Sequence, residues 1–410
     1  MREWIGTRFR DLASIQAEYP DVRSLDDEID FAAMNKAVRL AADTGRRVWL
    51  PPGTYLGWIY VRANGVSLAG AGASLTRIRL PDGAWHRSVR ENHPGMREGT
   101  PCVIEAGEIG RGNFAAPYSG FRLEGVTLDG NRLRTAAPKS PEEDIFGWGL
   151  AFTNMSQARY RDVEAVDCHA GGVGTFINAN GHQGACKVER CGFALGHPGF
   201  DVNSSQNGLW SVSSRDCSYG VRLLDNVWKS DLVATVQNAA NTGFLYDNQP
   251  ANASYANTIR VLVEGGCRDA GALIGANCSD SSLELAIKGV DGFGIHGLPS
   301  PMSAPRHAPN RYVVHTARGG ASSCLIEGDG DEWAIRSRLD GRGGTSGGSF
   351  AVDVRGSRNR LALDIADRPP SRIRGLAFRA GASHNSVVRY RHSGLIQDLM
   401  DLGENNHLVG

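Results

Sequence analysis

A short pattern recurs through most of the 410-residue sequence: a polar or small residue followed by an alternating run of apolar residues. Each copy holds runs with a period of two residues, which indicates β-strands, and no convincing helical pattern lies between the runs. Successive copies begin 21 to 28 residues apart, at Gln157, Gly184, Asn207, Asp231, Asn257, Ser282, Asn310, Glu332, Asn359, Asn385 and Asn406, with Asn64 and Gly120 extending the series upstream.

A repeat of this length cannot bury its own apolar side chains, so it must stack on its neighbours. The pattern therefore predicts an all-β fold, a parallel β-helix of about 12 rungs. We expect residues 48–410 to form a single domain of this kind. The 52 glycines are dispersed without a three-residue period, which fits frequent turns rather than collagen or a low-complexity linker.

The cysteines support this interpretation. Cys168, Cys217 and Cys267 each lie 10 or 11 residues after the first residue of their repeat, and Cys191 lies 7 residues after it. A shared position is expected of small apolar side chains stacked inside a coil. The sequence has no C-x-x-C motif and no Cys-His cluster at ligand spacing, so we predict no metal site from the cysteines.

The segment "DFAAMNKAVRLAADTG" predicts one amphipathic helix within residues 1–47. Phe31, Met34 and Val38 share one face, Asp27 is the expected N-cap and Gly45 the expected C-cap. We expect this helix to cover the open strand edge of the first rung.

The N-terminal third resembles a known superfamily. The helix followed by "GRRVWLPPGTYLGWIYV", "VSLAGAGASLTRIRL" and "FRLEGVTLDGNR" is similar to the N-terminal part of pectate-lyase-superfamily proteins, over residues 24–132. That group includes polysaccharide lyases, glycoside hydrolases and phage tailspikes. The resemblance implies a right-handed β-helix, but function does not follow from fold alone.

Five irregular segments interrupt the repeat. Each borders the strand that opens a repeat after a glycine, and two walls of insertions along one parallel sheet predict a groove suited to an oligomer or polymer. The segments are 83–100, 107–118, 132–148, 248–256 and 297–309.

Strand alternation places polar side chains in this groove. With Phe200 and Val202 inward, Asp201 and Asn203 face outward. The predicted catalytic residues are Asp201, Asp225 and Arg222, and the predicted substrate-binding residues are Asn203, Asp247, Lys229, His296, Tyr246, Trp148 and His86. The plainer interpretation of each charged residue is a solvated strand position or a surface salt bridge.

The chemistry depends on the strand register. Matching positions on adjacent rungs lie about 5 Å apart. If Asp225 stacks on Asp201, the two carboxyl groups have the spacing of a retaining glycosidase. If Arg222 stacks on Asp201, Arg222 neutralises a substrate anion and Lys229 or His296 removes a proton, as in a lyase or an epimerase. The sequence leaves both registers open.

The motifs of individual families do not decide between them. The N-T-D, D-D and G-H-G motifs of polygalacturonase-type hydrolases are not reproduced, because Pro198 replaces the first aspartate and "GIHG" only loosely resembles G-H-G. The Asp201, Asp225 and Asp247 carboxylates with an arginine resemble a calcium-dependent pectate lyase only weakly. The expectation is no cofactor, with Ca²⁺ as the candidate if the chain is a lyase.

Three classes of function follow from these observations. The leading hypothesis is an enzyme that cleaves or rearranges a glycosidic bond of an oligo- or polysaccharide, as a glycosidase, a glycosyl-transferring enzyme or a lyase. The alternatives are a non-catalytic, tailspike-like carbohydrate-binding β-helix and an intracellular isomerase or cyclase of a small metabolite. A fibre is disfavoured because no trimerising coiled coil is evident.

Charge and hydropathy bear on partners and location. The 44 basic and 44 acidic side chains balance, which gives no reason to expect nucleic acid or a membrane surface as partner. No signal-peptide pattern opens the sequence, which favours the cytoplasm unless a leader has been removed. The strand-like "NNHLVG" at the end predicts a homo-oligomer, of which a trimer is one form.

Overall fold

The computed structural model shows an all-β right-handed parallel β-helix, with one helix among the described residues, near the N-terminus, as the sequence predicts. The chain makes about ten turns, slightly fewer than expected, and its end strands β1 and β33 have only 3 and 2 residues. The described residues are 25–84, 100–107, 118–137, 147–176, 179–194, 196–249, 252–275, 277–298, 309–317, 324–339, 350–367, 374–393, 395 and 399–409.

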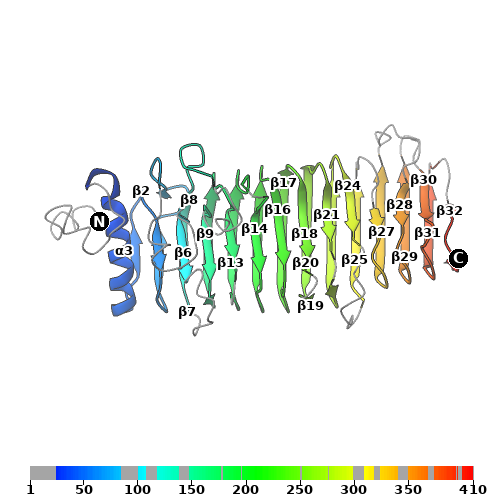
Figure 1. The fold of residues 1–410 in the computed structure, drawn as a ribbon, viewed down its shortest axis with the longest axis horizontal. Helices are drawn as coiled ribbons and strands as arrows, with labels where there is room; N and C mark the ends of the chain where they lie inside the picture. The colour runs from blue at the N-terminus through cyan, green and yellow to red at the C-terminus, as the bar shows by residue number, and fades with distance from the viewer. Residues whose placement is uncertain are drawn as a thin grey trace. The chain divides into compact units, whose positions relative to one another are not determined.

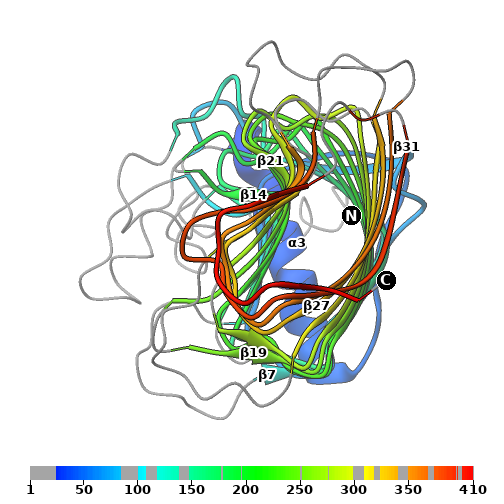
Figure 2. The ribbon, with the colours of Figure 1, turned by 90° about the vertical axis from the view of Figure 1, so that its right-hand side faces the viewer.

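The chain consists of two compact units, Met1–Ser213 and Ser214–Gly410. The prediction of a single domain over residues 48–410 stays a prediction. In each unit the strands alternate along the chain between two parallel sheets, named sheet A and sheet B, and a pair of two-residue strands lies on a third side. Figure 1 shows the strands stacked as successive rungs. Figure 2 shows β21, β31 and β19 of the second unit on three different sides of the coil.

The first described element of the first unit is helix α3 (Leu25–Thr44). Its sheet A contains β1 (Val48–Leu50), β2 (Gly53–Leu56), β4 (Ser67–Gly70), β5 (Thr76–Arg79), β8 (Arg122–Asp129), β11 (Arg159–Val166) and β13 (Gln183–Glu189), and β15 (Leu209–Arg215) crosses the boundary between the units. Its sheet B contains β3 (Ile59–Val61), β6 (Ile104–Gly107), β9 (Leu150–Thr153), β12 (Val173–Thr175) and β14 (Pro198–Asn203). The third side pairs β7 (Tyr118–Ser119) with β10 (Met155–Ser156).

The second unit continues the same plan. Its sheet A contains β17 (Asp231–Ala239), β20 (Thr258–Gly266), β23 (Ser282–Lys288), β25 (Arg311–Ala317), β27 (Glu332–Leu339), β29 (Arg360–Asp367), β31 (Ser386–Ser393) and β33 (His407–Leu408). Its sheet B contains β16 (Tyr219–Leu224), β18 (Thr242–Asp247), β21 (Ala270–Ile274), β24 (Phe293–Gly297), β26 (Cys324–Ile326), β28 (Phe350–Val354), β30 (Arg374–Phe378) and β32 (Leu399–Asp401). The third side pairs β19 (Ser254–Tyr255) with β22 (Cys278–Ser279).

Helix α3 packs against the first rung, as predicted. The Phe31 ring lies 4.5 Å from the Trp58 ring, and Asn35 Nδ2 donates to the Trp58 carbonyl at 2.8 Å. Gly45 has a φ of 67° and donates its N–H to the Ala41 carbonyl, as expected of a C-cap. The N-cap prediction is wrong, because the helix begins at Leu25 and Asp27 lies inside its first turn.

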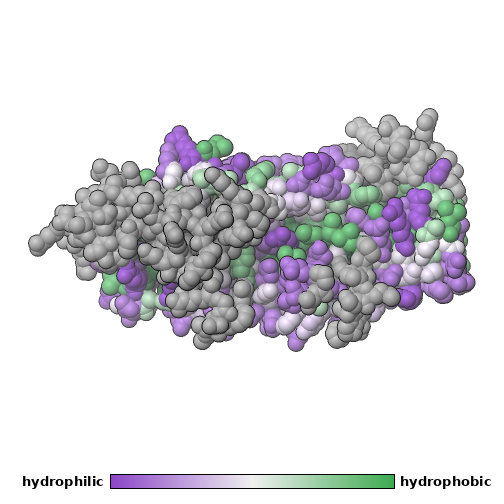
Figure 3. Space-filling view, in the orientation of Figure 1, coloured by the Kyte–Doolittle hydropathy of each residue, from purple (hydrophilic) through white to green (hydrophobic). Residues whose placement is uncertain are grey.

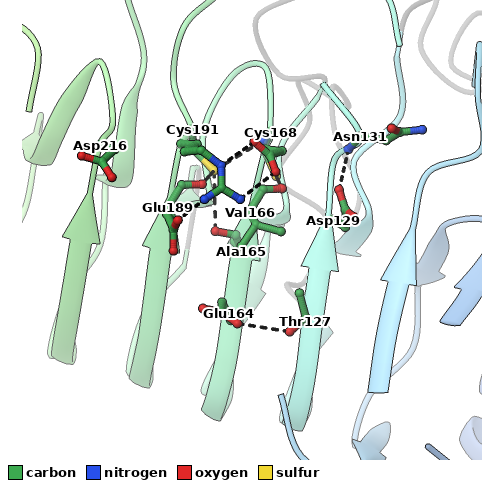
Figure 4. A network of polar contacts seen from close by, with 12 residues as sticks. Thr127, Asp129, Asn131, Glu164, Ala165, Val166, Cys168, Glu189, Cys191 and Asp216 are labelled. Atoms are coloured by element: carbon green, nitrogen blue, oxygen red, sulfur yellow. Dashed lines mark hydrogen bonds and ion pairs between the residues drawn. The ribbon is translucent and has the colours of Figure 1, made fainter. Parts of the chain in front are cut away.

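Four of the cysteines occupy the corner of the coil where sheet A leads into sheet B. The thiols of Cys168, Cys191, Cys217 and Cys267 each donate to the carbonyl of the residue two positions earlier, at 3.3 to 3.6 Å. Figure 4 shows Cys168 and Cys191 together at this corner of the first unit. The shared position confirms the predicted interior ladder, and none of the eight cysteines, all of which the structure describes, forms a disulfide.

A ladder of Asn, Ser and Asp side chains stabilises another corner of the second unit, between the third side and sheet A. Each backbone N–H donates to the side-chain oxygen at the same position of the next rung, at 2.9 to 3.2 Å. Because the side chain on each rung satisfies a buried backbone group of the rung before it, the ladder fixes the register of the coil. Its members are Ser230, Asn257, Ser281, Asn310, Asp331, Asn359, Asn385 and Asn406.

A buried histidine in the first unit makes folding sensitive to acid. His182 is fully buried against the Phe152 ring, and its Nε2 lies 2.7 Å from the Met155 carbonyl, to which it donates. Burial lowers the pKa of His182 to about 4, because the charged ring would lose its water. In the unfolded chain the pKa is about 6.5.

The unfolded state therefore binds a proton between about pH 6.5 and 4 that the folded state does not bind. As the pH decreases across this window, the free energy of unfolding is expected to decrease, by up to about 3 kcal/mol at the lower end. The variant His182→Gln, which retains a donor for Met155, should flatten the slope. Urea unfolding from pH 7 to 4 checks this, and identical slopes for both proteins would contradict the assignment to His182.

Candidate functional site

The outer face of sheet B in the second unit carries one continuous row of side chains. Strand register aligns Arg222 with Leu245, then Leu273, His296, Leu325, Asp353, Ala377 and Met400. Leu245 and Leu273 are half-buried, so two apolar side chains lie between Arg222 and His296 in this row. Figure 3, which looks at this side of the molecule, shows an apolar strip between polar margins.

His296 follows Leu273 in this row. Its Nε2 is 2.9 Å from Glu327 Oε2, and the other carboxylate oxygen of Glu327 accepts a hydrogen bond from Arg355 Nη1 at 3.0 Å. An ionised carboxylate can only accept, so Nε2 of His296 carries the hydrogen and Nδ1 of the neutral ring carries the lone pair. Both the His296 and the Glu327 side chains are 21% exposed. This geometry suits a general base oriented by an anchored carboxylate.

A second ion pair lies one rung further along. The carboxylate of Asp353 accepts from Arg379 Nε at 2.9 Å and from Nη2 at 2.6 Å. The Asp353 side chain is 8% exposed, and its hydrogen bond raises the pKa of the Arg379 guanidinium. Arg379 and Arg374 both lie over the Phe350 ring, at 5.1 and 5.5 Å from its centre. The outer face around Asp353 is therefore fixed by paired charges rather than left mobile.

Sequence reasoning missed Glu327, Arg355 and Arg379. The repeats that contain them read "CLIEG", "FAVDVRG" and "LAFRAG", so each places a charged residue directly after its sheet B strand, one or two residues before a glycine. That recurring position was the available signal. The position is informative because side chains alternate along a strand, so the residue after the last inward side chain faces outward.

In the first unit the outer row of sheet B contains two buried carboxylates. Register aligns Tyr60, Glu105, Ala151, Gly174 and Asp201 in that order. Glu105 and Asp201 are 3% and 1% exposed, whereas Phe200 and Val202 lie in the core, as alternation predicts. Three rungs separate the two carboxylates, about 14 Å along the sheet, which exceeds the spacing of either glycosidase class.

Trp148 packs across the middle of this first-unit row. Its ring is fully buried, lies 5.3 Å from the rings of Phe176 and His197, and occupies the space that a side chain at Gly174 would need. Cys102, Ala151 and Ala170 complete the cluster. Trp148 therefore acts as a packing residue and corrects the expectation of an exposed sugar platform.

Three further predicted site residues have structural roles. Asp225 has a φ of 52° in a turn, is 4% exposed, and its Oδ1 accepts from the Gln249 N–H at 2.6 Å. Tyr246 is fully buried inside the coil, with its hydroxyl bonded to Asn257 and Ser281. Lys229 has a φ of 50° and lies beyond the third side, not on sheet B. Turn geometry and inward alternation place these three side chains away from the outer row of sheet B. Their roles in catalysis or substrate binding stay predictions.

The remaining predictions are placed as follows. Asn203 ends β14 and accepts from the Ser204 hydroxyl at 2.9 Å, and Asp247 accepts from the Asn248 N–H at 2.8 Å. Arg222 lies on the outer row of the second unit and Asp201 on that of the first, so the stacking of Asp201 on Arg222 or Asp225 stays a prediction. His86 and most of segments 83–100, 107–118, 132–148 and 297–309 lie outside the described residues.

The described residues contain no group of three or more His, Cys, Asp or Glu side chains placed to hold a metal ion. The expectations about calcium and about an oligomer stay predictions. Within the part of the chain that the structure describes, no helix is both long enough and apolar enough to span a membrane.

Comparison with known proteins identifies relatives of the fold. No protein-family model and no curated sequence matches the chain. The tailspike protein of E. coli bacteriophage HK620, solved in complex with a pentasaccharide, matches with a TM-score of 0.60 and 11% identity, over 92% of this chain and 76% of that chain. The Dettilon tailspike protein matches with a TM-score of 0.54 and 12% identity, over 90% and 65% of the two chains.

An enzyme is also among the similar structures. The A-module of the Azotobacter vinelandii mannuronan C-5 epimerase AlgE6 matches with a TM-score of 0.49 and 15% identity, over 92% of this chain and 95% of that chain. At these identities the likeness concerns the fold alone.

Proposed function

We propose that the outer face of sheet B in the second unit binds an acidic carbohydrate and that His296 removes a proton from it, in an elimination or an epimerisation. The observation that carries the proposal is the chain of contacts from His296 through Glu327 to Arg355. A histidine whose Nε2 is held by a carboxylate presents Nδ1 as the basic atom.

The neighbouring side chains suit a uronate. The half-buried Leu245 and Leu273 offer an apolar surface to the face of a sugar ring. Arg355 is 50% exposed and uses Nη1 for Glu327, so its remaining N–H groups are available to a substrate carboxylate. Neutralising that carboxylate stabilises the negative charge that develops when the adjacent carbon loses its proton.

The steps balance with water as the only other reactant. His296 Nδ1 takes the proton from C5 of the uronate, the carbon next to the carboxylate. In an elimination the electron pair forms the C4–C5 double bond, the C4–O bond breaks, and the departing oxygen takes a proton from water, while His296 releases its proton to solvent. In an epimerisation water protonates C5 from the opposite face, and His296 releases its proton to solvent. Glu327 stabilises the imidazolium that forms.

The comparisons add support for a carbohydrate. The HK620 tailspike, whose structure contains a pentasaccharide, shares this fold over most of the chain. Paired-carboxylate hydrolysis is less well supported in the second unit, because Asp225 and Asp247 each accept a hydrogen bond from a nearby backbone amide. The first bond holds the Asp225 side chain in a turn, and the second engages the Asp247 carboxylate at the end of β18.

The proposal is tested with a panel of uronate and neutral oligosaccharides, each with Ca²⁺ and with EDTA. We expect only the uronate oligosaccharides to react, seen as absorbance of an unsaturated product or as inversion at C5. Release of reducing ends from neutral sugars, with no unsaturated or epimerised product from the uronates, would contradict it.

A further inference from the structure

A hollow of about 230 Å³ lies on the outer face of sheet A in the second unit, near its C-terminal end. Its floor is Val313, Ala334 and Ala362 on three adjacent strands, and Arg389 follows them in the same register row. The two alanines leave a depression because their neighbours on both sides are larger. The volume is below the roughly 300 to 1,000 Å³ of drug-sized ligand sites, which suits a single sugar ring.

A β-bulge turns two arginines toward this hollow. Leu361 pairs with Val387, but Ala362 pairs with Arg389, so Val388 is an extra residue in β31. The shift aligns Arg389 with the alanine row and Arg391 with Asp364 on the next row. Without the bulge, both arginines would alternate toward the core. Bulges that re-aim side chains in this way are common next to functional sites.

The face around the hollow carries excess positive charge. Glu332 pairs with Arg311 and Arg360 at 3.6 Å each. Asp364 pairs with Arg336 and Arg338 at 3.3 and 3.2 Å, and these contacts, led by the Arg338 hydrogen bond, hold the pKa of Asp364 below its usual range.

Each of these two carboxylates is therefore already shared between two arginines. Arg389 and Arg391 are exposed, and the described residues show no ion pair for either of them. On the preceding strands β20 and β23, by contrast, Arg260 pairs with Glu284 and Lys288 with Glu264.

We infer that this hollow is a second binding site, separate from the His296 face, for one anionic residue of an acidic polysaccharide. The apolar floor receives the face of the ring, and the guanidinium groups of Arg389 and Arg391 receive its carboxylate or sulfate. The choice of a carbohydrate rests on the proposed function, whereas the anionic character rests on the arginines themselves. Anchoring a polymer here would raise its effective concentration at sheet B.

The test measures binding of polygalacturonate, dextran sulfate and neutral dextran to the whole chain. We expect the double variant Arg389→Ala/Arg391→Ala to weaken binding of one or both anionic polymers by at least about tenfold, as loss of one charged contact implies. The variant Ala362→Glu, which leaves both arginines in place and adds a carboxylate to the floor, should give the same loss. The matched control Arg260→Ala/Lys288→Ala removes equal charge from the same sheet and should change binding less than about twofold.

Three results would overturn the inference: equal weakening by the control, unchanged binding in both hollow variants, or a change of sedimenting mass on mutation, which would mean that a second copy covers the face. Failure of the proposed function is distinguishable. Turnover of a uronate trisaccharide should survive in the hollow variants, and binding of the anionic polymer should survive in His296→Ala.

Discussion

His296→Ala is expected to lower the turnover of a uronate oligosaccharide by about 10² to 10⁴-fold, the usual contribution of a general base. The ring lies on the outer row of sheet B and contributes nothing to the interior of the coil. The thermal midpoint should therefore stay within a few degrees of that of the wild type. Steady-state kinetics and a melting curve on the same preparation measure both quantities.

Glu327 provides the accompanying test, because it positions the base rather than touching the substrate. Glu327→Gln should lower kcat while KM changes little, since the amide no longer stabilises the imidazolium. The matched control is His392→Ala, which removes an exposed histidine from sheet A of the same unit. A variant of His296 with wild-type kcat, or a control with an equal loss, would remove His296 from the mechanism.

Asn359→Leu is expected to lower the free energy of unfolding by roughly 2 to 6 kcal/mol, because it leaves two buried backbone groups without partners. The side chain is 1% exposed. Its Oδ1 accepts from the Asp331 N–H at 3.1 Å, and its Nδ2 donates to the Gly328 carbonyl at 2.9 Å. Leucine has a similar volume and can satisfy neither group.

Two comparisons sharpen that prediction. Asn359→Asp retains the acceptor and loses the donor, so its loss of stability should be intermediate. Asn238→Gly changes an exposed asparagine of the same unit, whose φ of 53° glycine adopts without strain, and should cost about 1 kcal/mol or less. Chemical unfolding of the four proteins gives the order, and an Asn359→Leu protein as stable as Asn238→Gly would refute the ladder as a major source of stability.

Most of the fold could be predicted from the sequence, because each level of the pattern agrees with the next. Phe200 and Val202 are buried as alternation requires, and three cysteines at a shared repeat position mark one corner. A β-helix repeats one local solution on every turn, so an error in one repeat does not spread to the others.

The candidate site was less predictable, because it depends on single residues where strands end. Asp225 follows a strand directly, but its left-handed backbone directs the carboxylate to the Gln249 amide instead of the outer face. Tyr246 was misplaced although alternation from Phe244 already predicted an inward side chain. His296 was among the predicted residues, but Glu327 and Arg355 lie on later rungs. His296 and Glu327 are 31 residues apart in the sequence, and Glu327 and Arg355 are 28 residues apart, so the sequence alone does not indicate their contacts.

The most direct measurement follows the uronate reaction in D₂O by NMR and mass spectrometry, with wild type and His296→Ala side by side. If His296 abstracts the C5 proton, the wild-type products carry either deuterium at C5 or a C4–C5 double bond, and the variant yields neither at a comparable rate. Products that retain their original C5 hydrogen, formed equally by both proteins, would contradict the account.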